Sequence, residues 1–234
     1  MSIKAQQKPA SPAEMIKRSF AVFKKDVTGE FRTRYAVNAI FLFAVTTLVA
    51  VSFSIGGADV SPSVQSALLW IIIYFSALSG LARAFVKEEE SHTSSALRLA
   101  AVPGAVFGGK LLFNFLLLIL LELVTVPLFV GIMGVQVKNW PLFIVVTGAG
   151  SAGLAVSATI VSAIVSKANA KGALFAVLSF PILLPVLIGG IRGTKAALSS
   201  VLFADGMQDV KLLVSYTGVM FVVALLVFRF IWED

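Results

Sequence analysis

The chain has 234 residues, of which 58% are hydrophobic and only 13% are charged, and its mean hydropathy is +0.95. Because a soluble domain carries about a quarter charged residues, these numbers exclude a soluble globular protein and indicate a polytopic membrane protein. The absence of cysteine and the single histidine, His92, exclude disulfides, thiolate metal sites and a multi-histidine metal or haem site within one subunit. The net charge of +7 is spread along loops, which indicates orientation in a bilayer and not nucleic-acid binding.

The first predicted element is an amphipathic helix within a cytoplasmic N-terminal segment, residues 1–34. Ser11 is followed by Pro12 and, three residues after the cap, by Glu14, which is the pattern of a capped helix start. Apolar residues then recur at spacings of three and four, at Ile16, Phe20, Phe23, Val27 and Phe31. Neighbouring basic residues can reach lipid headgroups, so we expect a helix lying in the membrane interface, with packing on a cytoplasmic partner as the alternative.

Six apolar blocks follow, each long enough to cross a hydrocarbon core about 30 Å thick. They cover residues 35–55, 64–86, 111–133, 141–166, 173–191 and 212–232, so residues 35–232 are expected to form one all-α transmembrane domain. Lys and Arg are retained on the cytoplasmic side, and fifteen of the nineteen belong to the N-terminal segment, the second and fourth connections and the C-terminus. Both termini are therefore expected in the cytoplasm. For residues 192–211, a short surface helix and a segment dipping into the membrane both remain open.

The second connection, residues 87–110, departs from the charge that prevails on its side of the membrane. Three consecutive acids, Glu88 to Glu90, are followed by residues 93–101, which favour a short helix with apolar Ala96, Leu97 and Leu99. A solvated charge run and a docking surface for a soluble partner are both compatible with this pattern.

Two short motifs resemble nucleotide-binding signatures. The stretch from Gly104 to Lys110, GAVFGGK, lacks the Ser or Thr after the lysine and the preceding strand that a phosphate-binding loop needs. We therefore expect a tight glycine turn there, with Lys110 as an anchor at the inner membrane interface. The stretch from Gly148 to Gly153, GAGSAG, lies inside the fourth span, where small residues at a period of four favour close helix packing (Ser151, Ala155, Thr159, Ala163).

Several stretches carry a resemblance to a known family. The run from Glu88 to Thr93, the Leu97-Arg98-Leu99 triplet, Pro103 and GKLLFN at residues 109–114 are similar to ABC-2 type permeases. Within that superfamily, GKLLFNFLLLILLELVTVPLF (residues 109–129) and SKANAKGALFAVLSFPILLPVLIGGI (residues 166–191) resemble the CcmB family, haem exporter protein B of cytochrome c maturation. One departure is His92, because the superfamily often has glycine before the Thr93 position, which leaves the local turn open.

The resemblance implies a permease with no nucleotide site of its own, working as a pair with two copies of a separate, CcmA-like ATP-binding subunit. It also implies CcmC-like and CcmD-like membrane partners, a CcmE-like periplasmic haem chaperone, and location in the bacterial inner membrane. ATP is expected on the partner subunit and haem as a transported or handed-over ligand, with no cofactor on this chain alone. No catalytic residue is expected, so the chain is not predicted to be an enzyme.

The first candidate site is residues 88–99, as a coupling helix that transmits closure of the ATPase pair to the spans. Its candidate residues are Glu88, Glu89, Glu90, His92, Thr93, Ala96, Leu97 and Leu99. Glu122 is the second candidate because an ionisable group within a span indicates function, although a purely structural hydrogen bond is the alternative. Asn114 lies two turns before it, Asn38 is expected to bond across helices, and Pro181 and Pro185 are expected to kink the fifth span. For His92, contact with the ATPase subunit is favoured over haem ligation.

Three rival functions remain. Another ABC-2 permease would export a drug, lipid or polysaccharide, whereas an autonomous ion-coupled carrier would use Glu122 as its proton or ion site. A membrane enzyme is the least favoured, because no cluster of His, Asp and Glu assembles a reaction centre.

Overall fold

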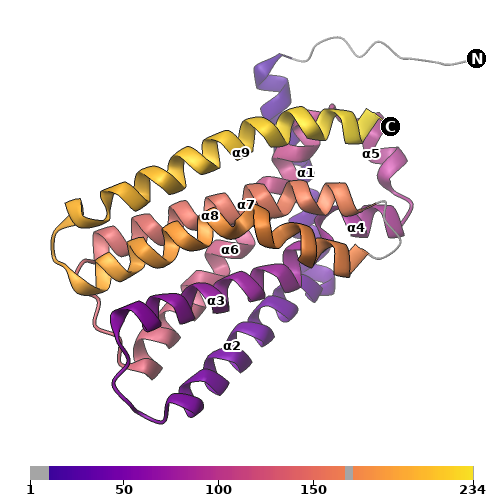
Figure 1. The fold of residues 1–234 in the computed structure, drawn as a ribbon. Helices are drawn as coiled ribbons and strands as arrows, with labels where there is room; N and C mark the ends of the chain where they lie inside the picture. Colours follow the sequence, from indigo (N-terminus) through magenta and orange to yellow (C-terminus); the bar gives the residue numbers. More distant parts are fainter. Residues whose placement is uncertain (1–10, 167–170, 234) are drawn as a thin grey trace, which may run out of the picture.

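The computed structural model describes residues 11–166 and 171–233, and within these ranges every regular element is helical (Figure 1). Six stretches are long and apolar enough to cross a membrane, which confirms the predicted all-α polytopic fold. Residues 1–10 of the N-terminal segment and residues 167–170 of the second family-like stretch lie outside the described residues. The elements are α1 (Pro12–Thr33), α2 (Tyr35–Ile55), α3 (Pro62–Leu81), α4 (Arg83–Glu90), α5 (Ser94–Ala100), α6 (Pro103–Met133), α7 (Trp140–Val165), α8 (Lys171–Ser199), η1 (Phe203–Gly206) and α9 (Met207–Glu233).

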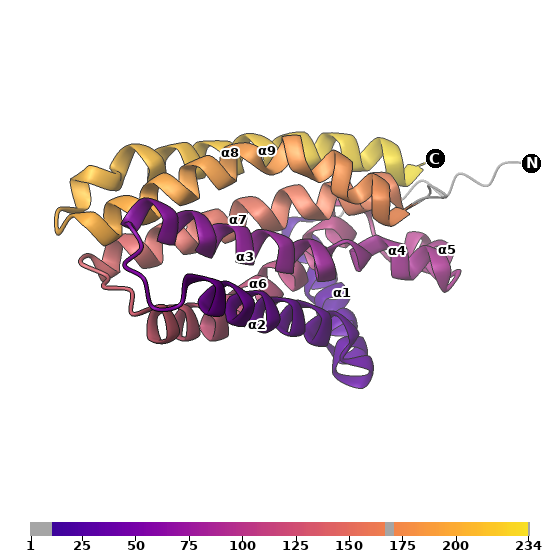
Figure 2. The same cartoon turned by 60° about the horizontal axis from the view of Figure 1, so that its bottom comes forward.

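Helix α1 begins with the predicted capping box. The Glu14 amide donates to the Ser11 hydroxyl over 3.3 Å, and the Ser11 amide donates to the Glu14 carboxylate over the same distance. The helix lies across one end of the bundle rather than along it (Figure 2). One side packs on α6, while Ile16, Phe20 and Phe31 on the apolar face are exposed. An uncovered apolar strip beside basic residues is what a helix in the membrane interface needs.

Helix α7 is the centre of the bundle, and it packs against α3, α4, α6, α8 and α9. Glycine allows α7 to approach α3 closely: a methyl group at Gly150 would lie 2.0 Å from Cη2 of Trp70 on α3, which leaves no room for a side chain. A methyl group on Gly190 of α8 would lie 2.3 Å from the same indole, whose Nε1 donates to Thr194 over 2.8 Å. The GAGSAG stretch is thus a packing surface, as predicted.

Two expectations about helix boundaries are wrong. The glycines of GAVFGGK form no turn, because α6 begins at Pro103 and runs through all of them. The missing side chain serves packing instead, since a methyl group on Gly109 would lie 2.6 Å from the Ser19 carbonyl oxygen of α1. Residues 192–211 adopt neither expected form, because α8 continues to Ser199 and α9 begins at Met207, with only a short connection and η1 between them.

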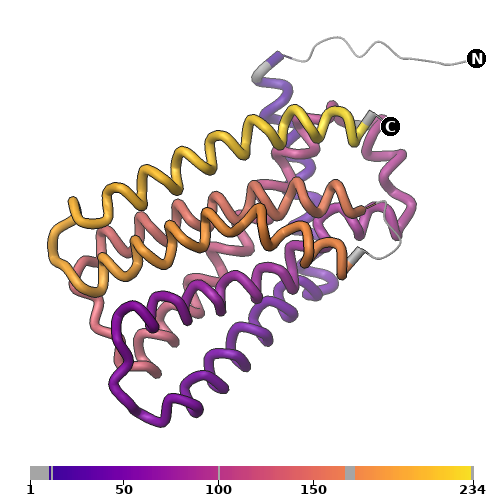
Figure 3. The backbone as a smooth tube through the Cα atoms, viewed as in Figure 1, coloured from indigo at the N-terminus to yellow at the C-terminus, as the bar shows by residue number. Residues whose placement is uncertain are grey.

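Helix α8 contains both predicted prolines, Pro181 and Pro185. It is continuous through them, and its axis changes direction near the middle of the helix (Figure 3). A proline in a helix removes a backbone hydrogen bond and clashes with the preceding turn, so a bend in this region is what these two residues would produce.

Candidate functional site

The connection between the second and third spans extends the bundle at the end that carries α1 (Figures 1 and 2). Helix α4 continues α3 with a break only at Ala82, and α5 leads into α6 through two residues. The short helix expected over residues 93–101 is present as α5, but the coupling helix expected over residues 88–99 is divided, because the chain turns between Glu90 and Ser94. His92 has a φ of 53° at this turn. That left-handed conformation favours glycine, so the turn fits the glycine that the resemblance to ABC-2 type permeases led us to expect before Thr93.

The eight predicted coupling residues divide into two groups by exposure. Glu90, His92, Ala96 and Leu99 are exposed, and Leu99 is 84% exposed. Glu89 is half-buried, and Glu90 pairs with Arg83 over 3.1 Å. The outward group therefore offers an exposed apolar side chain, Leu99, together with exposed polar side chains, a mixture that protein interfaces also contain.

The inward group consists of the buried Glu88 and Leu97, together with Thr93, whose hydroxyl bonds to Glu88 although the residue is exposed. Leu97 is buried in a small apolar cluster with Phe228 and Trp232 of α9. The side chains of Glu88 and Thr93 meet each other, because the Thr93 hydroxyl donates to Glu88 Oε2 over 2.7 Å. These residues hold α5 to the bundle rather than facing a partner.

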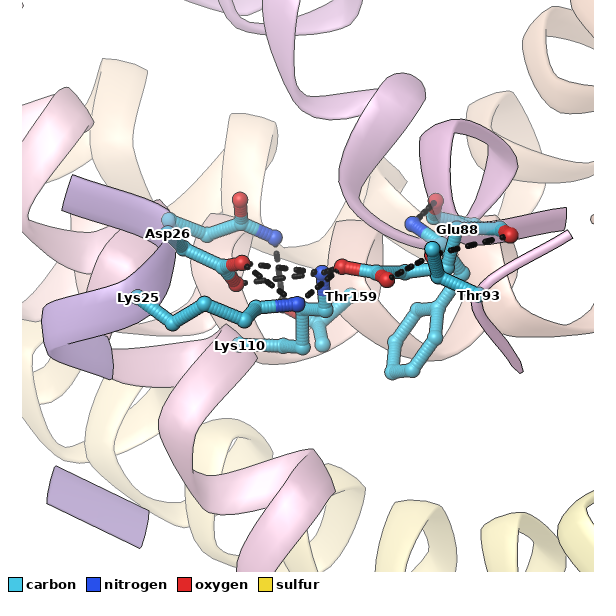
Figure 4. Close-up of polar contacts among 9 residues, drawn as sticks. Lys25, Asp26, Glu88, Thr93, Lys110 and Thr159 are labelled. Atoms are coloured by element: carbon cyan, nitrogen blue, oxygen red, sulfur yellow. Dashed lines mark hydrogen bonds and ion pairs between the residues drawn. The ribbon is translucent and has the colours of Figure 1, made fainter. Parts of the chain in front are cut away.

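Glu88 belongs to an ion cluster, which we define as Lys25, Asp26, Glu88, Thr93 and Lys110 (Figure 4). Asp26, Glu88 and Lys110 are buried or nearly so, whereas Lys25 and Thr93 are exposed. Lys110 Nζ lies 2.8 Å from Glu88 Oε1 and 3.0 Å from Asp26 Oδ2. Lys25 Nζ lies 3.3 Å from Asp26 Oδ1 and also contacts Glu88 Oε1. The ion cluster therefore joins α1, α4, the turn before α5, and α6.

The charges of the ion cluster balance, with two lysines against two carboxylates. The Lys110 side chain is only 3% exposed, so the expectation of a lysine anchored at the lipid surface is wrong. A buried charge needs a partner because the desolvation penalty is large, and here each carboxylate contacts both lysines. Burial alone would lower the pKa of Lys25, but Asp26 and Glu88 outweigh it and raise that pKa above its usual 10.5.

Lys25, Asp26 and Lys110 were not among the predicted site residues. A usable signal was present for Asp26, which lies four residues after the buried Val22 and four before the buried Glu30, so all three share the inner face of α1. For Lys110 the apolar run that follows suggested only the start of a span. Its contact with Glu88 depends on how α4 packs beside the start of α6, which the local sequence does not specify.

The intramembrane candidates form hydrogen bonds between α6 and α7. The Ser151 hydroxyl donates to Glu122 Oε1 over 2.6 Å, and Asn114 Nδ2 donates to Thr159 Oγ1 over 2.8 Å. Both interactions are of the kind that a structural role requires, while a transport or gating role for Glu122 stays a prediction. The expectation for Asn38 is wrong, because its side chain is exposed and makes no hydrogen bond to another helix in the described part of the chain.

No three metal-ligating side chains gather anywhere within residues 11–166 and 171–233. His92 is at the exposed turn before α5 and belongs to no such group among the described residues. At this end of the molecule, the turn before the α5 helix is thus bonded to the ion cluster, which joins α1, α4 and α6.

No curated protein matches the chain. The CcmB protein family matches residues 17–232, a range that includes the ion cluster, α5 and all six spans. The chain therefore belongs to the CcmB protein family, the multi-pass membrane permease components of an ABC-type haem exporter in cytochrome c biogenesis.

Proposed function

We propose that this chain is the subunit through which ATP hydrolysis on a separate, CcmA-like ATP-binding protein drives haem export or delivery, or release of the haem-loaded periplasmic chaperone. The observation that carries the proposal is the pairing of an exposed α5 with the ion cluster behind it. A mechanical coupling element needs an outer face for its partner and a rigid link to the moving helices. The two groups of residues in this connection supply these two requirements.

The direction of transmission follows from the chain path. Because α4 continues the second span and α5 leads directly into the third, a push on α5 displaces both spans at their ends. The ion cluster keeps α4 from bending independently, since Glu88 is held to Lys110 of α6 and, through Lys25, to α1. The four segments therefore move as one unit when the ATP-binding subunits close.

The orientation supports the same assignment. The α1, α4 and α5 segments and the last turn of α9 lie at one end of the bundle (Figure 1), where most of the basic residues also fall. Lys and Arg are retained on the cytoplasmic side, so this end faces the cytoplasm of the cell, and the membrane is the bacterial inner membrane. The permease works with a second copy of itself and with CcmC-like, CcmD-like and CcmE-like partners, while haem is cargo rather than a resident cofactor.

The test is a pair of matched substitutions at exposed leucines on opposite ends of the molecule. Leu99→Glu places a charge on the proposed contact face, and Leu202→Glu places one in the connection after α8, where the side chain is 61% exposed. The complex is purified through this chain in mild detergent, and the ATP-binding subunit and the covalent haem on c-type cytochromes are measured. We expect Leu99→Glu to lose both and Leu202→Glu to keep the ATP-binding subunit.

Two results would overturn the proposal. Full retention of the ATP-binding subunit and of cytochrome haem by Leu99→Glu would remove α5 from the contact. Normal cytochrome haem after deletion of the gene would assign the permease to another cargo, such as a drug, lipid or polysaccharide. Substitution of Glu88 is unsuitable for this test because Glu88 is buried, so its loss would disturb the fold as well as the contact.

A further inference from the structure

Helix α5 has a second contact with the bundle, separate from the ion cluster. The aromatic cluster, as we define it, consists of four buried rings from α4, α6 and α9: Phe85, Phe107, Phe228 and Trp232. Leu97 of α5 packs into this cluster. The aromatic cluster therefore joins α5 to the last turns of α9, the sixth span, which the chain reaches only after three intervening spans.

Trp232 contacts both α5 and the rest of the aromatic cluster. Its ring stacks on that of Phe228, with the centroids 5.3 Å apart and an angle of 26° between the planes, and meets the ring of Phe85 edge-on at 6.1 Å. The guanidinium carbon of Arg98, on α5, lies 5.3 Å from the centroid of the Trp232 ring. A cation over an indole face is attracted by the ring, more strongly where water is excluded. Helix α5 is therefore attached to Trp232 by apolar contact through Leu97 and by the charge of Arg98.

The aromatic cluster and the ion cluster meet at Phe85. Lys110 Nζ lies 5.6 Å from the centroid of the Phe85 ring, and the Phe228 ring lies 5.2 Å from it on α9. The ion cluster itself includes no residue of α9. Close-packed side chains have little room to yield, so they transmit a displacement to their neighbours. The sixth span is therefore connected to the coupling end through aromatic rings, and not through the charges or the path of the chain.

We propose that Trp232 is a positioning residue through which displacement of α5 moves the adjoining end of α9. The inference rests on the proposed function, because the ATP-binding subunit supplies the push on α5. When α5 is pushed, Leu97 and Arg98 press on Trp232, and the stacked Phe228 follows with it. The sixth span then moves with the third. Neither cluster contains a residue of α8, so α8 serves as the reference for this movement.

The test measures whether α9 follows α5 in the intact complex. The chain has no cysteine, so spin labels attach only at cysteines that are introduced, and it is labelled before assembly with its ATP-binding subunit. One variant carries Leu226→Cys on α9 with Val177→Cys on α8, and the other carries Leu112→Cys on α6 with Val177→Cys, all at exposed positions. The distances are measured by electron spin resonance before and after ATP is trapped with vanadate. We expect both to change by about 2 Å or more, the size of helix shifts in such transitions.

The two label pairs separate this inference from the proposed function on which it rests. A change between α6 and α8 without one between α9 and α8 would refute the role of Trp232 and leave the proposed function standing. No change in either pair would mean that ATP does not move the spans, and both would be refuted.

Matched variants assign the movement to Trp232. Trp232→Leu keeps an apolar side chain without a ring, whereas Trp232→Phe keeps a ring that can stack on Phe228. We expect Trp232→Leu to retain the ATP-binding subunit and the change at α6, to lose the change at α9, and to lower cytochrome haem at least about fivefold, the smaller end of coupling effects between sites. Trp232→Phe should restore both. Phe230→Leu, at an exposed ring two residues away, should behave as the wild type.

Arg98 provides a second pair of variants in case Trp232→Leu fails to fold. Arg98→Gln leaves the aromatic cluster in place and removes the cation, and Arg98→Lys keeps a cation. We expect the change at α9 to shrink in Arg98→Gln and to persist in Arg98→Lys, with the ATP-binding subunit retained in both. A response of α9 as large as that of the wild type in Arg98→Gln, and in Trp232→Leu where it folds, would refute the proposal.

Discussion

Replacement of Lys110 by methionine tests whether the ion cluster is structural support for the coupling end. Methionine keeps most of the side-chain length and removes the charge. In the wild-type protein the Lys110 ammonium lies 2.8 Å from Glu88 and 3.0 Å from Asp26, and those two side chains are only 9% and 10% exposed. The substitution therefore leaves two buried carboxylates with a single cation, Lys25.

The expected loss of unfolding free energy depends on the contacts that the two carboxylates keep after the substitution. Removing one partner of a buried ion pair destabilises a protein by about 3–5 kcal/mol, because the other charge stays buried without compensation. Here Lys25 still reaches both carboxylates, and Thr93 still donates to Glu88. Because the Lys25 side chain is 46% exposed, solvent weakens its attraction. We expect the free energy of unfolding of Lys110→Met to fall by about 3 kcal/mol, the lower end of that range.

The assay is reversible unfolding in mixed detergent micelles, followed by the loss of helical circular dichroism. The double variant Lys110→Met/Glu88→Gln restores charge balance, leaving Lys25 to Asp26, and should recover about 1–2 kcal/mol relative to Lys110→Met alone. Lys17→Met, an exposed lysine of α1, should stay within about 0.5 kcal/mol of the wild type. A loss below about 1 kcal/mol for Lys110→Met, or a double variant less stable than the single one, would refute the reasoning.

Three further outcomes are expected. The pKa of Lys25 is raised in the folded protein, so its charge stabilises the fold fully below the unfolded pKa of 10.5, and this stabilisation is lost as pH rises through the higher folded pKa. The loss of unfolding free energy caused by Lys25→Met should therefore be constant near neutral pH and vanish only in strong alkali, which unfolding measured at several pH values checks. Gly150→Ala should destabilise by about 1–3 kcal/mol because its methyl group meets Trp70, whereas Gly148→Ala, which meets nothing within 4 Å, should stabilise by up to about 1 kcal/mol in the same assay; equal effects would contradict the packing account. His92→Gly should unfold at the same or higher denaturant concentration than the wild type, since relief of a left-handed backbone offsets the greater freedom of unfolded glycine, and a clear loss would mean that the imidazole itself stabilises the turn.

Features that depend on periodicity or on local chemistry could be predicted from the sequence. The first span was expected over residues 35–55, and α2 covers Tyr35–Ile55. The capping box of α1 is local to four residues, Ser11 to Glu14, so the pattern alone specifies it. Small residues at a period of four on α7 indicated close packing for the same reason, because that spacing places them on one helix face.

Features that depend on which helices meet could not be predicted in this way. The glycines of GAVFGGK show only that a Cβ is missing, and a missing Cβ serves either a turn or a close approach. In the fold it is the approach of α1 to Gly109. Lys110 was placed at the lipid surface because a lysine before an apolar run usually marks the boundary of a span. Its burial requires carboxylates from α1 and α4, which are 84 and 22 residues away along the chain.

Variants of α5 and of Lys110 can distinguish binding of the ATP-binding subunit from transmission of its movement to the spans. GAVFGGK does not form a phosphate-binding loop, since its amides from Ala105 onward donate to carbonyl oxygens of α6 or of Val102, and the Lys110 ammonium is already bound to two carboxylates. Leu99→Glu changes the outer face of α5 and leaves the ion cluster untouched, so it should abolish association with the ATP-binding subunit at unchanged stability. Lys110→Met leaves the outer face intact and loosens α4 from α6, so the subunit should still bind while cytochrome haem falls. If both variants lost the subunit together, α5 and the ion cluster would act as one docking surface and the rigid link behind it would have no separate role.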